Sequence, residues 1–69
     1  MIDFQFTVKP EHIGIVPKIT EFIKKHSTKP ILEIVETKDG TIYMLEIDEQ
    51  NQFIIFDQDL KVSFPYIFN

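Results

Sequence analysis

Residues 2–8 alternate between apolar and polar side chains. Asp3, Gln5 and Thr7 separate four apolar residues, and a period of two is typical of a strand with one buried face. The pattern predicts a β-strand over residues 2–8.

A helical pattern follows a segment that contains two prolines. A helix that began at Pro10 would carry Pro17 in its second turn, where proline breaks helical hydrogen bonding. We therefore expect the helix to begin near Pro17, because proline suits the first helical position. Residues 19, 22, 23 and 26 recur with the spacing of one helix face. The helix should stop by Ser27 or Thr28, since Pro30 disfavours helical geometry at the residue before it.

Residues 31–68 have the pattern of a four-stranded meander. Runs of apolar and β-branched residues predict strands over residues 31–37, 41–48, 53–57 and 62–68, with turn signals between them. Pro65 marks the last of these as an edge strand. The predicted order is β-α-β-β-β-β, a single α+β domain over residues 1–69 with one helix packed on a mostly antiparallel sheet.

The clearest turn signal is Asp39-Gly40, a pair favoured in two-residue hairpin loops. With these two residues as the loop, Ile34 lies opposite Leu45. This register agrees with the alternation of apolar residues, so it predicts that Ile34 and Leu45 are buried neighbours on the side of the helix.

The small size of the chain limits its core. It has 69 residues, of which 43% are hydrophobic, and a core of this size stabilises a fold by only about 3–5 kcal/mol. We therefore expect a homodimer formed through the sheet. No apolar run approaches the roughly 20 residues of a membrane span, and the N-terminus lacks a signal-peptide pattern, so we expect a cytoplasmic protein.

The residue types offer little for catalysis or cofactor binding. There is no Cys and there are two glycines, which excludes thiolate chemistry and a glycine-rich phosphate loop. His12 with Asp57 and Asp59 could form a metal site only through folding, and their spacing matches no metal motif. We interpret His26 as a residue that interacts with the dipole at the helix C-terminus. The sequence thus predicts neither an enzyme nor a bound metal or cofactor.

Charge is distributed unevenly along the chain. Residues 1–32 carry five Lys against three carboxylates, a net charge of +2, whereas residues 33–69 carry eight carboxylates against two Lys, a net charge of −6. In the expected register Glu33 lies directly opposite Glu46 on the face away from the helix, and like charges in that position are destabilising. The candidate protein-binding site on this face consists of Glu33, Val35, Met44, Glu46 and Asp48. Its apolar part would be extended by Ile42, Ile54 and Phe56.

These features favour a non-catalytic module that binds a basic protein. The chain has no Arg and a net charge of −4, which disfavours direct contact with nucleic acid. Carboxylates two residues apart on a strand are about 6.8 Å apart, so an array of them can imitate a phosphate backbone. Small acidic phage proteins that act as DNA mimics and inhibitors are similar in character. A second interpretation is that the acidic residues only keep a small sheet soluble and discourage edge pairing.

A different function follows from a resemblance in the first half of the chain. The segment from Lys9 to His26 resembles the opening strand, loop and helix of ACT regulatory domains, over about a third of the chain. The resemblance implies a small-molecule-binding regulatory domain, with Gly14 near the loop that approaches the ligand. The βαββαβ pattern of that family has a second helix, for which the expected strands leave no counterpart between Asp48 and Asn69.

Overall fold

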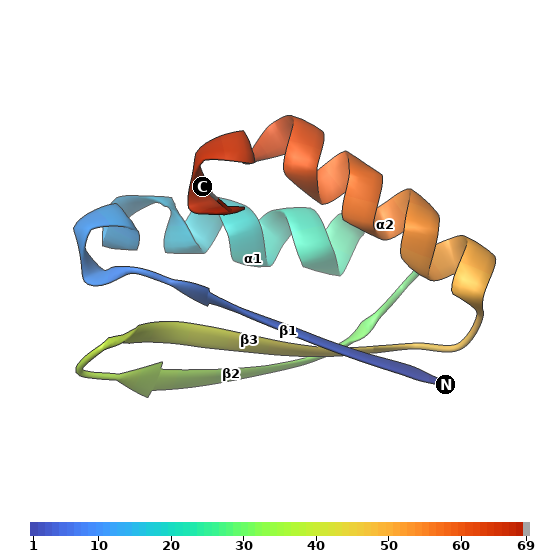
Figure 1. Ribbon diagram of the computed structural model, residues 1–69, viewed down its shortest axis with the longest axis horizontal. Helices are drawn as coiled ribbons and strands as arrows, with labels where there is room; N and C mark the ends of the chain where they lie inside the picture. The colour runs from blue at the N-terminus through green and yellow to red at the C-terminus, as the bar shows by residue number, and fades with distance from the viewer. Residues whose placement is uncertain (69) are drawn as a thin grey trace.

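The computed structural model describes residues 1–68, with the backbone alone at Phe68. Its elements are β1 (Ile2–Val8), a 3-10 helix (Pro10–Ile15), α1 (Val16–Lys25), β2 (Ile31–Thr37), β3 (Gly40–Ile47), α2 (Gln50–Ser63) and a second 3-10 helix (Pro65–Phe68). Both α-helices lie on one side of an antiparallel sheet (Figure 1). The expected α+β class is confirmed, with three strands and two helices in place of five strands and one helix. Asn69, the last residue of the predicted domain, lies outside the described residues.

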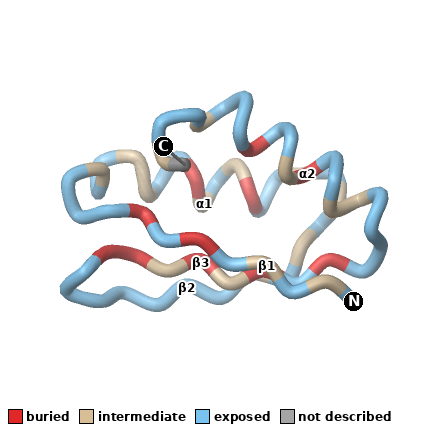
Figure 2. Tube along the Cα trace, viewed as in Figure 1, coloured by how far each residue is buried: buried red, intermediate tan, exposed pale blue. Residues whose placement is uncertain are grey.

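Strand β1 directs its apolar residues towards the core and its polar residues away from it, as predicted. Phe6 and Val8 are buried, whereas Asp3, Gln5 and Thr7 are exposed. Figure 2 shows this change of burial along the strand. The two faces of β1 are therefore chemically distinct.

The boundaries of helix α1 follow the prolines. Residues 10–15 form a 3-10 helix with a kink at His12, so no continuous helix runs from Pro10. Helix α1 begins at Val16 with Pro17 in its first turn, and it ends at Lys25. The predicted start near Pro17 and stop before Pro30 are confirmed.

The hairpin of β2 and β3 has a different loop from the predicted one. Thr37 pairs with Gly40, which leaves Lys38 and Asp39 as the loop. A type I′ turn needs positive φ at both loop residues, and neither Lys38 nor Asp39 has it. Gly40 has a φ of 137°, and a Cβ added to it would overlap the carbonyl oxygen of Val8. The glycine is thus required by the close approach of β1.

The observed loop shifts the hairpin register by two residues. Ile34 lies opposite Tyr43, and Leu32 takes the predicted place of Ile34 opposite Leu45. The prediction that Ile34 and Leu45 face each other is therefore wrong. Because a shift of two residues keeps each side chain on its own face, both still lie on the side of the helices, where Leu45 is 2% and Ile34 is 37% exposed.

The largest departure from the prediction lies after Asp48. Residues 50–63 form helix α2, so the predicted strands over residues 53–57 and 62–68 are wrong. Pro65 begins a 3-10 helix and does not mark an edge strand. Phe56 and Leu60 are buried, and Phe53 packs against the core beside them. Their spacing of three and four residues is that of a helix face.

Helix α2 also changes the comparison with ACT domains. It occupies the place of the second helix in the βαββαβ order, which the sequence analysis assigned to strands. Within the described part of the chain, a 3-10 helix and not a final strand follows it. A Cβ added to Gly14 would have open space around it, so no close approach requires glycine there.

The core lies between the helices and the sheet, with Tyr43 of β3 at its centre. The ring of Tyr43 stacks on Phe6 at 5.0 Å between centroids. Its hydroxyl donates a hydrogen bond to the Val16 carbonyl oxygen (3.0 Å) and lies 2.9 Å from the Thr20 hydroxyl. Burial raises the pKa of the Tyr43 phenol, and the bond to Thr20 opposes this effect. These contacts fix α1 on the sheet. Within residues 1–68, no helix is both long and apolar enough to cross a membrane.

Candidate functional site

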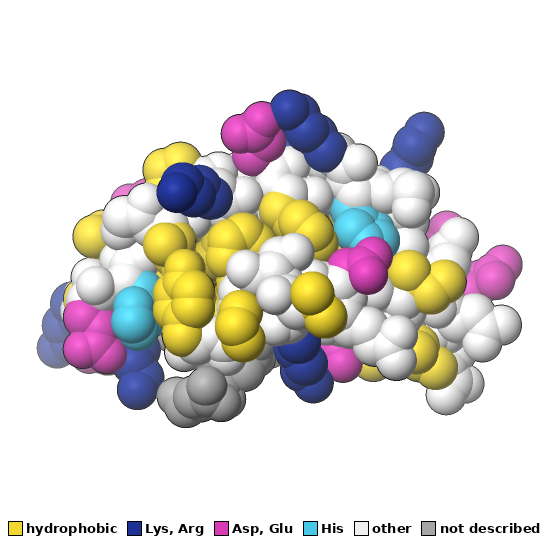
Figure 3. Space-filling view, turned by 90° about the horizontal axis from the view of Figure 1, so that it is seen from above, with side chains coloured by type: hydrophobic (Ala, Val, Ile, Leu, Met, Phe, Trp, Pro, Cys, Tyr) yellow, Lys and Arg dark blue, Asp and Glu magenta, His cyan; other side chains and the backbone are white. Residues whose placement is uncertain are grey.

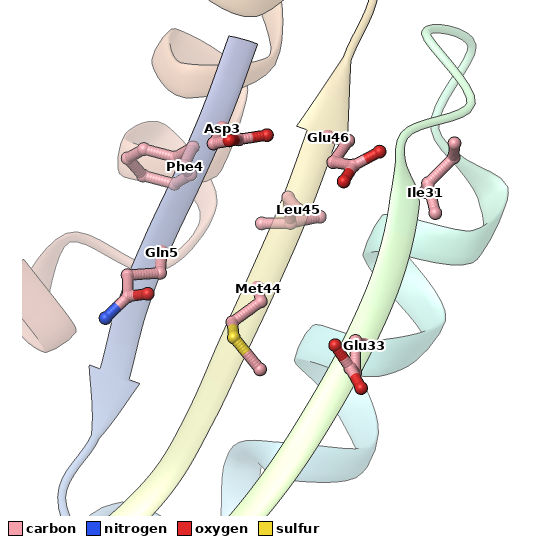
Figure 4. Close-up of a pocket in the computed structure, with 8 residues that line it drawn as sticks. All are labelled: Asp3, Phe4, Gln5, Ile31, Glu33, Met44, Leu45 and Glu46. Atoms are coloured by element: carbon pink, nitrogen blue, oxygen red, sulfur yellow. The ribbon is translucent and has the colours of Figure 1, made fainter. Parts of the chain in front are cut away.

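The helices cover only one face of the sheet. We call the other side the open face; its residues come from alternate positions of the three strands. Figure 4 shows part of this face with the helices behind the strands. Strand order and register place the following residues on it: Asp3, Gln5, Thr7, Ile31, Glu33, Val35, Ile42, Met44 and Glu46.

Acidic residues gather at one end of the open face. Glu46 lies in the central strand, directly opposite Asp3 on one side and Ile31 on the other. Glu33 lies in the next row, opposite Met44. Glu33 is therefore diagonal to Glu46, and the predicted direct pairing of these two residues is wrong. The like-charge pair that the register does create is Asp3 with Glu46.

None of these three acidic side chains has a cationic partner in the described part of the chain. Asp3, Glu33 and Glu46 are exposed, and no Lys or His of residues 1–68 forms an ion pair with them. Directly opposite side chains on neighbouring strands have Cβ atoms about 4.5–5.5 Å apart, and like charges there are destabilising. The open face thus carries three uncompensated negative charges.

A shallow depression of about 320 Å³ lies among these residues. The side chains of Ile31 and Met44 supply its apolar part, and Asp3, Glu33 and Glu46 supply carboxylates at its rim (Figure 4). Val35 adds a further exposed apolar side chain to the open face, at 37% exposure. This combination of carboxylates around an apolar floor suits the aliphatic stem and charged head of a Lys or Arg side chain.

The structure brings together most of the predicted site. Glu33, Val35, Met44 and Glu46 all lie on the open face. Asp48 lies beyond the last residue of β3 and is exposed, so the register of the sheet does not place it on the open face, in contrast to the prediction.

The expected apolar extension of the site holds in part. Ile42 lies on the open face opposite Val35. Ile54 and Phe56 do not, because both belong to α2, where Phe56 is part of the core. Asp3, which was not among the predicted site residues, also lies on the open face. The alternation of Asp3 with apolar neighbours in residues 2–8 was the signal that could have found it.

The side of the molecule with the helices has a different electrostatic character (Figure 3). A wide, open depression of about 550 Å³ there is lined by five charged or titratable residues, and four of them, all except Lys18, form ion pairs within the described part of the chain. Lys25 pairs with Glu21, and the hydrogen bond and charge of Lys25 lower the pKa of that carboxyl. His26 pairs with Asp59 at 2.8 Å. These four side chains are paired within the fold, unlike the carboxylates of the open face.

The histidines take up structural contacts. The His26 ring is buried against Phe22 and Phe56, and it joins the end of α1 to α2 through Asp59. The ring of His12 lies near Tyr66 at 5.5 Å between centroids. In residues 1–68 no three His, Cys, Asp or Glu side chains gather as metal ligands do, so the structure does not join His12 to the two aspartates of α2.

The chain was also compared with known proteins. No protein-family model matches it, and neither the curated proteins nor the solved structures gave a significant match. The case for a function therefore rests on the geometry and charge of the open face.

Proposed function

We propose that the protein is a non-catalytic interaction module whose open face binds a basic surface of another protein. The observation that carries this proposal is the placement of Asp3 directly opposite Glu46, with no ion pair to either residue among residues 1–68. Like charges in that position oppose folding, and a Lys or Arg of a partner would relieve the repulsion. The net charge of −4 would also speed association with a basic surface.

A nucleic-acid-binding protein is the partner class that suits this surface best. Such proteins present clustered basic side chains for phosphates. Adjacent strands of the sheet lie about 4.7–4.9 Å apart, so the three carboxylates form a compact anionic group. Occupation of a basic groove by this group would exclude nucleic acid and make the module an inhibitor.

The small-molecule alternative has support from the fold alone. Helix α2 supplies the second helix that the resemblance to ACT domains implies. Neither of the two depressions described above is lined by Gly14, and fold does not determine function. The charge of the open face therefore favours the protein-binding proposal.

The test compares two variants of equal net charge. The open-face variant carries Asp3→Asn, Glu33→Gln and Glu46→Gln. The control variant carries the same types of change at exposed acidic residues elsewhere, Glu36→Gln, Asp39→Asn and Glu49→Gln.

Both variants and the parent protein are immobilised and used to capture proteins from a lysate of the source organism at low and high salt. The parent and the control variant should retain the same basic proteins at low salt, and high salt should release them, because screening shortens to about 3 Å at 1 M. The open-face variant should bind them at least about a hundredfold more weakly, since hydrogen bonds to charged groups contribute about 1.5–3 kcal/mol each. Retention of the same proteins by the open-face variant would contradict the proposal.

A further inference from the structure

Strand β1 leaves one edge of the sheet open. Among the described residues it pairs with β3 alone, and β2 lies on the far side of β3. The edge of a sheet presents backbone groups that can pair with a strand of another chain. The sheet therefore has two candidate edges, β1 and β2.

The two edges differ in how well they could support an added strand. In β2 every residue except Leu32 is exposed, and the strand carries two Glu, residues that discourage pairing at an edge. In β1 Phe6 and Val8 are buried, and Phe4 packs edge-on against Phe53 of α2 at 5.3 Å between centroids. An added strand beside β1 would extend a sheet that the helices already support.

The sequence of β1 is self-complementary about its middle residue. Antiparallel pairing of two copies with Gln5 opposite Gln5 is the only register that pairs all seven residues of the strand. It places Phe4 opposite Phe6 of the second copy and the two aliphatic ends of the strand opposite each other. Asp3, the one charged residue of the strand, meets Thr7 of the second copy. Parallel in-register pairing would instead place Asp3 opposite Asp3, which is destabilising.

We propose that the protein forms a homodimer in which β1 pairs antiparallel with β1 of a second copy about Gln5. The dimer has one six-stranded sheet with four helices on one side. The two-fold axis stands perpendicular to the sheet, so both open faces point the same way and form one surface. This inference rests on the edge of β1 and not on the proposal of a basic partner.

The dimer is tested by cysteine cross-linking, for which the absence of native Cys makes each variant specific. Directly opposite residues in an antiparallel pair have Cα atoms about 4.5–5.5 Å apart, within the range of a disulfide. Gln5→Cys should therefore cross-link to itself under mild oxidation. Asp3→Cys or Thr7→Cys alone should cross-link at least about tenfold more slowly. Each introduced Cys would lie about 13 Å along the strand from the same Cys in the second copy. A mixture of the last two variants should cross-link to each other.

The control for cross-linking is Val35→Cys, on the same face but on strand β2. Equal cross-linking of Val35→Cys and Gln5→Cys would overturn the proposed pairing. A parent protein that sediments as a monomer from micromolar to submillimolar concentration would overturn it as well.

A second measurement does not depend on disulfide geometry. Thr7→Lys would place a cation opposite Asp3 of the second copy, and Thr7→Glu would place an anion there, each twice per dimer. The dissociation constant of the dimer should be about tenfold lower for Thr7→Lys than for Thr7→Glu. Val35→Lys and Val35→Glu are matched controls, because Val35 lies in the same row at the opposite edge. If the dissociation constants of the two Val35 variants differ by the same factor as those of the two Thr7 variants, this result would count against pairing through β1.

Discussion

Glu46→Gln should stabilise the fold, because Glu46 faces one carboxylate directly and another diagonally. For a distance of about 6 Å to Asp3, the repulsion in water is about 0.7 kcal/mol, and screening at physiological ionic strength reduces it to about 0.3 kcal/mol. Glu33, about 7–8 Å away on the diagonal, adds roughly 0.2 kcal/mol under the same conditions. The free energy of unfolding should therefore rise by about 0.5 kcal/mol, which corresponds to about 2–4 °C in Tm for a domain of this size.

Salt dependence makes this prediction specific. At low ionic strength the gain should rise to about 1 kcal/mol, because both repulsions are then almost unscreened. Thermal or urea unfolding at two salt concentrations gives the comparison. The matched control is Glu36→Gln, which removes one charge from β2 at a position opposite Thr41. An equal gain in Glu36→Gln, or no gain in Glu46→Gln at low salt, would refute the electrostatic argument.

The same substitution should act in opposite directions on stability and binding. If the open face binds a basic partner, Glu46→Gln weakens the complex while it strengthens the free protein. A residue retained only for folding would not behave in this way, since its removal would not raise stability.

Three further predictions concern the core and the hairpin. Tyr43→Phe should lower stability by about 1–2 kcal/mol in urea unfolding, because the Val16 carbonyl loses a donor and Thr20 loses its partner; an unchanged midpoint would show that the hydroxyl is not needed. Since the pKa of Tyr43 is raised in the folded protein, its contribution is complete below the unfolded pKa of about 10 and is lost as pH rises through the higher folded value. The free energy of unfolding should therefore fall less between pH 7 and alkaline pH in Tyr43→Phe than in the parent. Gly40→Ala should destabilise by more than about 1 kcal/mol, because its φ is positive and its Cβ would overlap the backbone of Val8; a melting temperature equal to that of the parent would contradict the observed approach of the strands.

The spacing of apolar residues correctly predicted the elements that have one clearly apolar face. The strict alternation of residues 2–8 and the prolines around α1 act locally, so β1 and α1 were predicted with nearly correct bounds. The faces of β2 and β3 were also correct, so four of the five residues of the predicted site lie together on the open face. The register was not, because Gly40 is required by contact with Val8, which is distant in sequence.

The prediction failed over residues 50–63 for a different reason. The run from Phe53 to Phe56 consists of aromatic and β-branched residues, which favour strands. Two of its four residues, together with Leu60, also fit a helix in which residues 53, 56 and 60 face inward, and packing on the sheet decides between strand and helix. Exposure of Ile54, Ile55 and Val62 blurs the amphipathic pattern that would have indicated the helix.

The uneven burial of the three strands has a kinetic consequence. Strand β3 buries five of its eight residues, whereas β2 buries none and relies on its backbone bonds to β3. Regions with few buried contacts open with small free energies, so amide hydrogens of β2 should exchange earlier than those of β3. Glu33 is carried by this more easily opened strand, while Asp3 and Glu46 are carried by strands anchored in the core. The acidic surface thus combines two charges on well-anchored strands with a third on a strand that opens more easily, so the third could adjust its position to the shape of the proposed partner.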